Sequence, residues 1–360
     1  MNYLTIFVVS VLISAISTLF VIKLAKKYGF MDYPGRAHPA NIITTPTPRA
    51  GGIPILISLL VLVPLFVSAS GVMETPRIIS FLLASTLLVV LGTLDDKYDL
   101  NPYLRFGINL LSALLIVGSG IAINWLPNPF GGEIRFDQLV WQFGLFGKSY
   151  SIPILADLLT LVWLTWMMNA INWSKGVDGQ LPGIVTIASL ILSFVALKYV
   201  EVDPTQTSVA ILAFIVSGAY FGFLPFNFYP QRIMPGYGGG ALAGLLLGVL
   251  AILAGGRLAT TLLVLIVPLA DALFAIVRRL MKGKSPFWGD RGHLHHKLLD
   301  LGWSKAQVAL FYWLLTAVSG WAALNLGSKG KSVALASVGV IIISILTTLY
   351  FTISPNKKDN

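Results

Sequence analysis

The sequence predicts an all-α fold, a polytopic membrane helical bundle of about eleven transmembrane helices with a short periplasmic hairpin. Of its 360 residues, 56% are hydrophobic and only 11% are charged, and its mean hydropathy is +0.81. This composition lies far outside that of soluble proteins. Its apolar runs are long enough, or nearly so, to cross ~30 Å of hydrocarbon, and no alternating strand pattern competes with them.

The predicted helices are taken here in chain order. They lie near residues 3–24, 51–70, 77–93, 104–125, 153–171, 182–199, 207–226, 239–255, 258–277, 306–325 and 332–353. The first run lacks a small-residue cleavage site and is bordered by lysines, so it predicts a retained helix rather than a removed signal peptide. Segment 126–152 alternates like a short hairpin with turn-forming glycines and predicts a periplasmic loop. Without internal repeats or a low-complexity tail, residues 1–360 are expected to form one integral membrane domain.

Basic residues are distributed unevenly between the two sides of the predicted bundle. With an external N-terminus, all but seven of the 25 Lys and Arg residues fall in loops after odd-numbered helices or in the C-terminal tail. The seven on the opposite side are Arg77, Arg135, Lys148, Lys198, Arg257, Lys329 and Lys331. Since loops rich in Lys and Arg stay in the cytoplasm, this bias predicts an external N-terminus and a cytoplasmic C-terminus.

Charge and cysteine content exclude several classes of protein. The formal net charge is +10, but the basic residues are spread over many loops. This spread argues against nucleic acid as a partner and favours contacts with the anionic headgroups of a lipid bilayer. The chain has no cysteine, which excludes disulfides, thiolate catalysis and Cys-type zinc sites.

Adjacent carboxylates mark the inner end of the third run. In LGTLDDKYDL, Asp95 and Asp96 are neighbours, and Asp99 follows Asp95 by one helical turn. Carboxylates at a membrane border repel each other and lose hydration, so they favour a bound cation. Oxygen ligands of this kind suit Mg²⁺ together with substrate phosphates. The alternative is a solvated helix end paired with Lys97 and Arg105.

Two glycine-containing segments follow. In NAINWSKGVDGQLPG, after the fifth run, Asn172 and Asp178 flank a turn whose N–H groups could approach a ligand; an ordinary interhelical turn is the alternative. Glycines repeat every four residues from Gly240 to Gly248, which indicates close helix packing. The preceding loop 236–239 is freer to form a backbone anion site.

Segment 278–305 combines Arg and Lys residues with three of the four histidines of the chain. It predicts a cytoplasmic loop in which Arg and Lys bind a diphosphate and His hydrogen-bonds a phosphate or a sugar. A zinc site is disfavoured, because HLHH lacks the helical i, i+4 ligand spacing and a nearby Glu. A basic loop resting on lipid headgroups is the alternative.

Two further features fall on the same predicted face. The loop between the first two runs contains Arg36, His38 and Arg49, which could reach an anion. Asp271 lies inside the ninth run, where a carboxylate is either functional or the partner of a neighbouring helix. Together with the other polar loops, these residues predict a metal-bound phosphate ligand at the membrane surface.

Six motifs occur in a fixed order. They are D-x-P-x-R-x-H with P-T-P-R-x-G-G (32–52), L-D-D-x-x-D-L (94–100), N-A-x-N…G-x-D-G (169–179), G-F-L-x-F-N (222–227), P-L-x-D (268–271) and R-R…G-x-S-P…D-R-x-H-L-H-H (278–296). This order resembles the polyprenyl-phosphate N-acetylhexosamine-1-phosphate transferase superfamily, glycosyltransferase family 4. HLHH followed by KLLDLGWS is similar to the undecaprenyl-phosphate GlcNAc-1-phosphate transferase branch rather than to the phospho-N-acetylmuramoyl-pentapeptide transferase branch.

The resemblance implies a reaction at a bacterial plasma membrane. A polyprenyl phosphate, such as undecaprenyl phosphate, attacks the sugar-linked phosphorus of a UDP-sugar and releases UMP, with Mg²⁺ (Mn²⁺ as a substitute) neutralising the diphosphate. It implies catalytic roles for Asp95, Asp96, Asp178 and His295, metal ligation by Asp95, Asp96 and Asp178, and substrate binding by Arg49, Asn172, Lys175, Asn227, Arg291, His293 and His296. A homodimer is one assembly that the resemblance allows.

The sequence departs from the family pattern at two positions. The pattern after the fifth run is usually N-L-x-D-G-x-D-G, and the pattern between the seventh and eighth runs is M-G-D-x-G-S, whose Asp is a metal ligand. Here Lys175 and Tyr237 stand at the two acidic positions. Two fewer acidic residues remove much of the charge that would hold Mg²⁺, and Tyr, with an unperturbed pKa of about 10, is a poor Mg²⁺ ligand.

Three explanations of these departures stay open. Lys175 supplies part of the charge of the metal beside a weaker Mg²⁺ site, or the chain is a catalytically impaired relative that binds lipid phosphate or nucleotide, or the substrate or metal has changed. We expect transferase activity to survive, because the remaining motifs are intact. The rivals from other classes are an intramembrane aromatic prenyltransferase, which needs a second Asp-rich motif, and a transporter or scaffold, which leaves HLHH without a role.

Overall fold

The computed structural model describes residues 2–35, 43–71, 73–128, 130–145, 148–255, 257–285 and 291–352. Its helices are α1 (Tyr3–Tyr28), α2 (Gly52–Leu62), α3 (Thr75–Tyr98), α4 (Pro102–Gly118), α5 (Ile154–Trp173), α6 (Gln180–Leu197), α7 (Gln206–Asn227), α8 (Gly236–Leu253), α9 (Leu258–Val264), α10 (Ile266–Met281), α11 (Leu294–Asp300), α12 (Lys305–Asn325) and α13 (Ser328–Thr352). Three antiparallel strand pairs accompany them: β1 (Met31–Asp32) with β2 (Thr47–Pro48), β3 (Trp125–Pro127) with β4 (Glu133–Arg135), and β5 (Val140–Leu145) with β6 (Lys148–Pro153).

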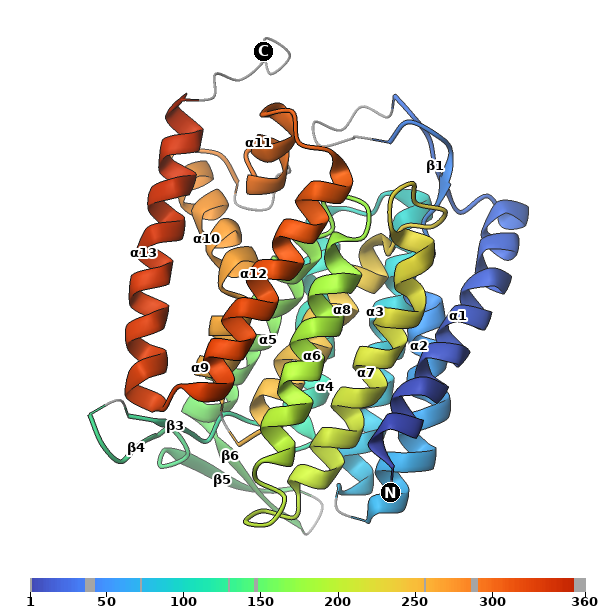
Figure 1. Cartoon of the computed structure of the whole chain (residues 1–360). Coiled ribbons are helices and arrows are strands. Elements are labelled where there is room, and N and C mark those ends of the chain that lie inside the picture. The colour runs from blue at the N-terminus through green and yellow to red at the C-terminus, as the bar shows by residue number, and fades with distance from the viewer. Residues whose placement is uncertain are drawn as a thin grey trace.

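The long helices pack side by side in one bundle, with the strands at its two ends (Figure 1). Among the described residues, nine helices are long and apolar enough to cross a membrane, counting α2 together with the helical turns Val63–Val67 and Ser68–Ser70 that continue it, and the bent pair α9–α10 would form a tenth span. The shorter apolar helix α4 coincides with the predicted fourth run. The predicted all-α, multi-pass membrane fold is therefore confirmed, whereas the count of eleven spans stays a prediction.

The structure differs from the predicted bounds of two runs: one is divided into two helices, and the other is shorter than predicted. The run 258–277 is divided at Leu265 into α9 and α10, whose axes differ by 83°. Pro268 accounts for this break, because its ring lacks an N–H and would collide with the carbonyl of Val264 in a continuous helix. The run 104–125 was predicted too long, since α4 ends at Gly118 and Gly120 has a left-handed φ of +81°.

The glycines of α8 let the centre of the bundle pack closely. Nearly every residue of α8 is buried. A Cβ added at Gly244 would collide with the backbone of Met167 in α5, and one at Gly240 would collide with the Asn172 side chain. The predicted packing role of this glycine repeat is confirmed, and it holds the end of α5 against the start of α8.

The two ends of the bundle differ in their chemistry. The start of α1 lies at the same end of the bundle as strands β3–β6, which occupy the segment where a short hairpin was predicted (Figure 1). β1, α11 and the end of α13 lie at the opposite end (Figure 1). We refer to this opposite end as the α11 end. The loop between α1 and α2 is tied to it by the Met234 N–H, which donates to the carbonyl of Pro48 at 2.8 Å.

Candidate active site

Two polar clusters at the α11 end meet at the α5–α6 loop, residues 174–179. The carboxylate cluster consists of Arg49, Asp95, Asp96, Arg105, Lys175 and Tyr237. The histidine cluster consists of Asp271, Arg279, His293, His295 and His296. Gly176 joins them, because it follows Lys175 and lies so close under the His295 ring that a Cβ there would overlap the imidazole.

Asp96 caps the start of α8. The backbone N–H of Tyr237 donates to both carboxylate oxygens of Asp96, at 2.9 and 3.0 Å. A carboxylate is stabilised at a helix N-terminus by the free N–H groups and the helix dipole. Gly236 has a φ of +70°, and a Cβ there would overlap Asp96, so this approach requires glycine. Arg49 adds an ion pair to Asp96, with 3.4 Å between Nε and Oδ1.

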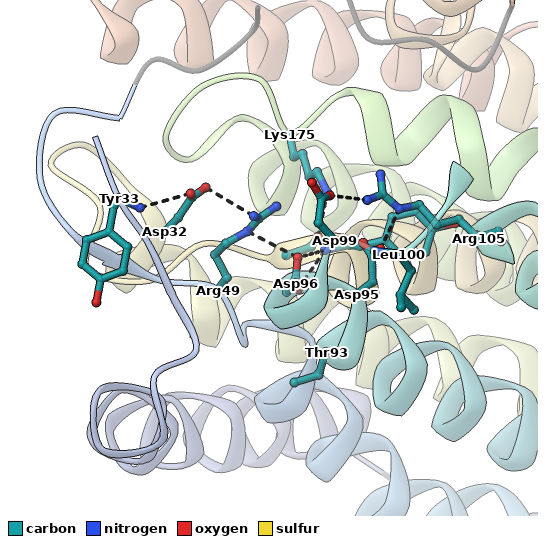
Figure 2. A network of polar contacts seen from close by, with 12 residues as sticks. Asp32, Tyr33, Arg49, Thr93, Asp95, Asp96, Asp99, Leu100, Arg105 and Lys175 are labelled. Carbon is teal, nitrogen blue, oxygen red and sulfur yellow. Dashed lines mark hydrogen bonds and ion pairs between the residues drawn. The ribbon is translucent and has the colours of Figure 1, made fainter. Parts of the chain in front are cut away.

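Asp95 is bound by Arg105 on the other side of α3. Arg105 Nε donates to Asp95 Oδ1 at 2.6 Å, and its Nη2 donates to Asp99 at 2.7 Å. Figure 2 shows Arg105 beside these two carboxylates and Arg49 between Asp32 and Asp96. The predicted alternative partner Arg105 is therefore present, although Asp95 is buried rather than solvated.

Lys175 brings a third cation to the carboxylate cluster. Its ammonium donates to the carbonyl of Gly236 at 3.0 Å, so one peptide unit binds Lys175 through its carbonyl and Asp96 through its N–H. Burial lowers the pKa of Lys175 to about 8, and the nearby Asp96 opposes this shift. An ammonium with this pKa is still mainly protonated at neutral pH.

The Tyr237 ring lies near both Lys175 and Arg105. The Lys175 Nζ lies 5.7 Å from the Tyr237 ring centroid, and the Arg105 guanidinium carbon lies 5.8 Å from it. The Tyr237 hydroxyl points toward α4, 3.1 Å from Asn109 Oδ1. Because the hydroxyl proton is used inside the protein, this side chain supports the cluster through its ring rather than offering an oxygen to a ligand.

The histidine cluster is held by Asp271, which α10 carries next to α11. Asp271 Oδ2 lies 2.9 Å from His293 Nδ1, and its other oxygen accepts the Leu294 N–H at 2.9 Å. On the far side of the ring, Arg279 lies 3.2 Å from His293 Nε2. Of the two readings of Asp271 left open by the sequence, that of a partner to neighbouring residues is the one that this geometry supports.

Several buried polar atoms of the described protein near the junction of the clusters have no hydrogen-bond partner. Asn172 Oδ1 and His295 Nδ1 are among them. Burial lowers the pKa of His295 well below its usual value, and the neighbouring His296 and His293 add to this shift. His295 is therefore neutral, with a ring nitrogen available to hydrogen-bond a ligand. Buried polar atoms without partners cost free energy, so they indicate a place where a polar ligand binds.

Among the described residues, Asp178 has different hydrogen-bond partners from Asp95 and Asp96. It accepts hydrogen bonds from Lys305 Nζ and from the Gln231 N–H, each at 3.3 Å. Asn227 braces the same loop, accepting from the Gly179 N–H at 3.1 Å. Its amide donates to Gln231 and to the backbone, so the predicted substrate contact of Asn227 stays a prediction.

Other predicted site residues lie outside these clusters or outside the described residues. Arg291 pairs with Asp300 at 3.1 Å on the surface of the α11 segment. Arg36 and His38 lie outside the described residues. The sequence analysis missed Asn109 and Lys305; a lone Asn within an apolar run was a signal for the former, whereas no local pattern marked Lys305.

The predicted ligation of Mg²⁺ or Mn²⁺ by Asp95, Asp96 and Asp178 stays a prediction. Among the described residues, no three His, Asp or Glu side chains could together hold a metal ion. Each of the three carboxylates has a protein cation as its partner: Arg105 for Asp95, Arg49 for Asp96 and Lys305 for Asp178. A divalent cation would therefore compete with these protein cations for the same carboxylates.

Comparison of the sequence with known proteins identifies a family. The model of glycosyl transferase family 4 matches residues 78–255. The chain is 30% identical to a probable undecaprenyl-phosphate N-acetylglucosaminyl 1-phosphate transferase of Bacillus subtilis, over 98% of this chain and 92% of that protein. It is 27% identical to a decaprenyl-phosphate N-acetylglucosaminephosphotransferase of Mycolicibacterium smegmatis, over 94% of this chain and 86% of that protein.

A third relative also matches most of this chain. It is an undecaprenyl-phosphate alpha-N-acetylglucosaminyl 1-phosphate transferase of Escherichia coli, 27% identical over 88% of this chain and 83% of that protein. The predicted resemblance to the GlcNAc branch is confirmed by these relatives. With similarity over nearly its full length, and with the family motifs gathered at one end of a membrane bundle, the chain belongs to glycosyl transferase family 4.

Proposed function

We propose that this chain transfers a sugar 1-phosphate, GlcNAc-1-phosphate, from a UDP-sugar to a polyprenyl phosphate and releases UMP. The names of its relatives support the polyprenyl phosphate acceptor and the GlcNAc group. The observation that carries the proposal is the meeting of the α3 carboxylates, the α5–α6 loop and the α11 histidines at one end of the bundle. An anionic lipid headgroup and a soluble nucleotide can both reach such a place.

The reaction requires one bond to form and one to break. An oxygen of the lipid phosphate attacks the phosphorus attached to the sugar, and the bond from that phosphorus to the bridging oxygen breaks. UMP leaves with the bonding electrons. The protein contributes mainly by positioning the two substrates and by stabilising the charge that develops on the leaving oxygen.

The two clusters would divide this work. Arg49 and Lys175 would bind phosphate oxygens, while Asp95 or Asp96 would accept any proton that remains on the lipid phosphate. The neutral His295 would hydrogen-bond the phosphate or the sugar through Nδ1, and Asn172 Oδ1 would accept a hydrogen bond from a sugar hydroxyl or N–H, since both atoms lack a partner in the described protein. A Mg²⁺ ion would neutralise the diphosphate, as it does in the general chemistry of phosphoryl transfer, although the part of the chain that the structure describes has no group of three His, Asp or Glu side chains to hold it.

Orientation and assembly complete the proposal. The N-terminus would be external and the α11 end cytoplasmic, in agreement with the bias of Lys and Arg residues. Labelling of single cysteines introduced into this cysteine-free chain, at Leu301 and at Phe130, would place the two ends relative to the membrane. A homodimer stays a prediction, which the mass of the detergent-solubilised particle would test.

A direct assay tests the proposed reaction. Purified protein is incubated with UDP-GlcNAc and undecaprenyl phosphate, with Mg²⁺ in one arm and EDTA in the other, and UMP and the lipid-linked product are measured. We expect equimolar release of the two products. Binding of UDP-GlcNAc without release of UMP in either arm would instead identify a catalytically impaired relative. Absence of both binding and release would reject the proposal.

A further inference from the structure

We infer that Lys175, supported by Tyr237, is a built-in cation that takes the place of a divalent metal at the diphosphate site of this chain. The inference rests on the proposed function and narrows it: the UDP-sugar diphosphate would be bound, and the transfer carried out, without Mg²⁺. The position of Lys175, the charge of the cluster, the contact with Tyr237 and the chemistry of the ligand support it.

The Lys175 ammonium lies at the start of α8. Its Nζ donates to the carbonyl of Gly236 at 3.0 Å. The N–H of the same peptide unit is bound by Asp96 at 2.9 Å. A single peptide unit therefore links the ammonium to the carboxylate, at the place where carboxylates alone would call for a bound cation.

The net charge of the carboxylate cluster also depends on Lys175 and Tyr237. With acidic residues at positions 175 and 237, four carboxylates would lie together beside Arg49 and Arg105. Lys175 and Tyr237 remove two of these negative charges and add one positive charge. This change exceeds the two positive charges that a divalent ion would supply. The cluster therefore has no electrostatic need for Mg²⁺.

The Tyr237 ring also stabilises the positive charge of Lys175. The Tyr237 ring lies 5.7 Å from the Lys175 ammonium and 5.8 Å from the Arg105 guanidinium carbon. An aromatic face stabilises a cation without neutralising it. Its hydroxyl is anchored on Asn109 Oδ1 at 3.1 Å, which fixes the position of the ring. Tyr237 therefore supports both positive groups with one aromatic ring.

A protonated lysine is also suited to bind the phosphate oxygens of a diphosphate. A lysine ammonium is a compact point charge that binds phosphate oxygens in nucleotide sites. It cannot hold a metal ion while it is protonated. The burial that lowers its pKa to about 8 leaves it mainly charged at pH 7. A divalent ion at this position would be repelled by the ammonium, so a protonated Lys175 and a bound divalent ion exclude each other.

Binding of UDP-GlcNAc, measured by isothermal titration calorimetry on the purified full chain in detergent, tests the inference apart from catalysis. We expect the same affinity in EDTA and in Mg²⁺. Lys175→Met should weaken binding by about tenfold to a hundredfold, the range for loss of a charged hydrogen bond. Lys175→Arg should retain most of it. Lys97→Met, which removes an exposed lysine at the same end, is the matched control and should bind normally.

The converse experiment restores the carboxylates. The double variant Lys175→Asp with Tyr237→Asp should bind UDP-GlcNAc only when Mg²⁺ is present. If EDTA abolishes UDP-GlcNAc binding to the unmodified protein and Mg²⁺ restores it, the inference is overturned while the proposed function stands. If the unmodified protein binds in neither condition, the proposed function itself fails. Should Lys175→Met not fold, the comparison of EDTA with Mg²⁺ on the unmodified protein decides alone.

Discussion

The ammonium of Lys175 lies 5.7 Å from the centre of the Tyr237 ring, so the two residues that depart from the family pattern are neighbours in space. They are 62 positions apart in the chain and come from the α5–α6 loop and from α8. Since the family pattern has acidic residues at both positions, the two departures fall in one site. In this chain the ring of Tyr237 supports the charge of Lys175 there.

The hydroxyl of Tyr237 is expected to matter for stability rather than for ligand binding. Tyr237→Phe keeps the ring and removes the bond to Asn109, whose buried amide would lose a partner. The free energy of unfolding should fall by about 1–2 kcal/mol, and UDP-GlcNAc affinity should not change. Thermal unfolding in detergent, followed by intrinsic fluorescence, measures the first effect. A Tyr237→Phe protein that is fully stable but has lost nucleotide binding would contradict this assignment.

Binding of UDP-GlcNAc in EDTA should weaken as the pH rises through about 8. The Lys175 pKa of about 8 lies below the usual 10.5, so the ammonium loses its proton, and with it the attraction for phosphate, above that pH. Asp95 and Asp96 from α3 favour the charged form, whereas Arg49 and Arg105 oppose it, and the Tyr237 ring also faces it.

Titration calorimetry between about pH 7 and pH 9 tests this dependence, since the unperturbed pKa values of the other side-chain types lie mostly outside this range. Lys175→Arg keeps its charge throughout the range and should bind equally well at both ends of it. A decline of the same size in Lys175→Arg would show that a group other than Lys175 is titrating.

Asp271 should contribute to stability through the histidine cluster. Asp271→Asn removes the charge that orients His293 and weakens the bond to the Leu294 N–H. Because hydrogen bonds to charged groups contribute about 1.5–3 kcal/mol, a fall of that order in the free energy of unfolding is expected. Asp300→Asn, at the exposed pair with Arg291, is the control and should change stability by at most about 1 kcal/mol. Equal effects of the two substitutions would argue against a special role for Asp271.

Gly176 is expected to be required for activity, because it leaves room for His295. In Gly176→Ala the new Cβ would overlap the imidazole and displace it. Since a misplacement of about 1 Å can cost about a hundredfold in rate, UMP release should fall by about that factor. Gly107→Ala, in α4, meets no atom within 4 Å and is the control, with unchanged UMP release. An active Gly176→Ala protein would mean that His295 does not act from its observed position.

The local residue pattern predicted a large part of the fold. The apolar runs located the long helices, and the four-residue glycine spacing correctly indicated the packing of α8 against α5. These features depend on hydropathy and small side chains, which act over a few turns of one helix. The break at Leu265 was foreseeable from Pro268, but its 83° angle depends on what packs around it.

The sequence by itself determined that the chain crosses a membrane and which residue types gather at one end, because these follow from apolar run lengths and from the order of the loops. Only the tertiary structure decided the partners: Arg105 for Asp95, Lys305 for Asp178, and Lys175 against Tyr237. The reason is that such pairs join segments far apart in the chain. Their meeting depends on the rotation and offset of whole helices, which no local pattern encodes.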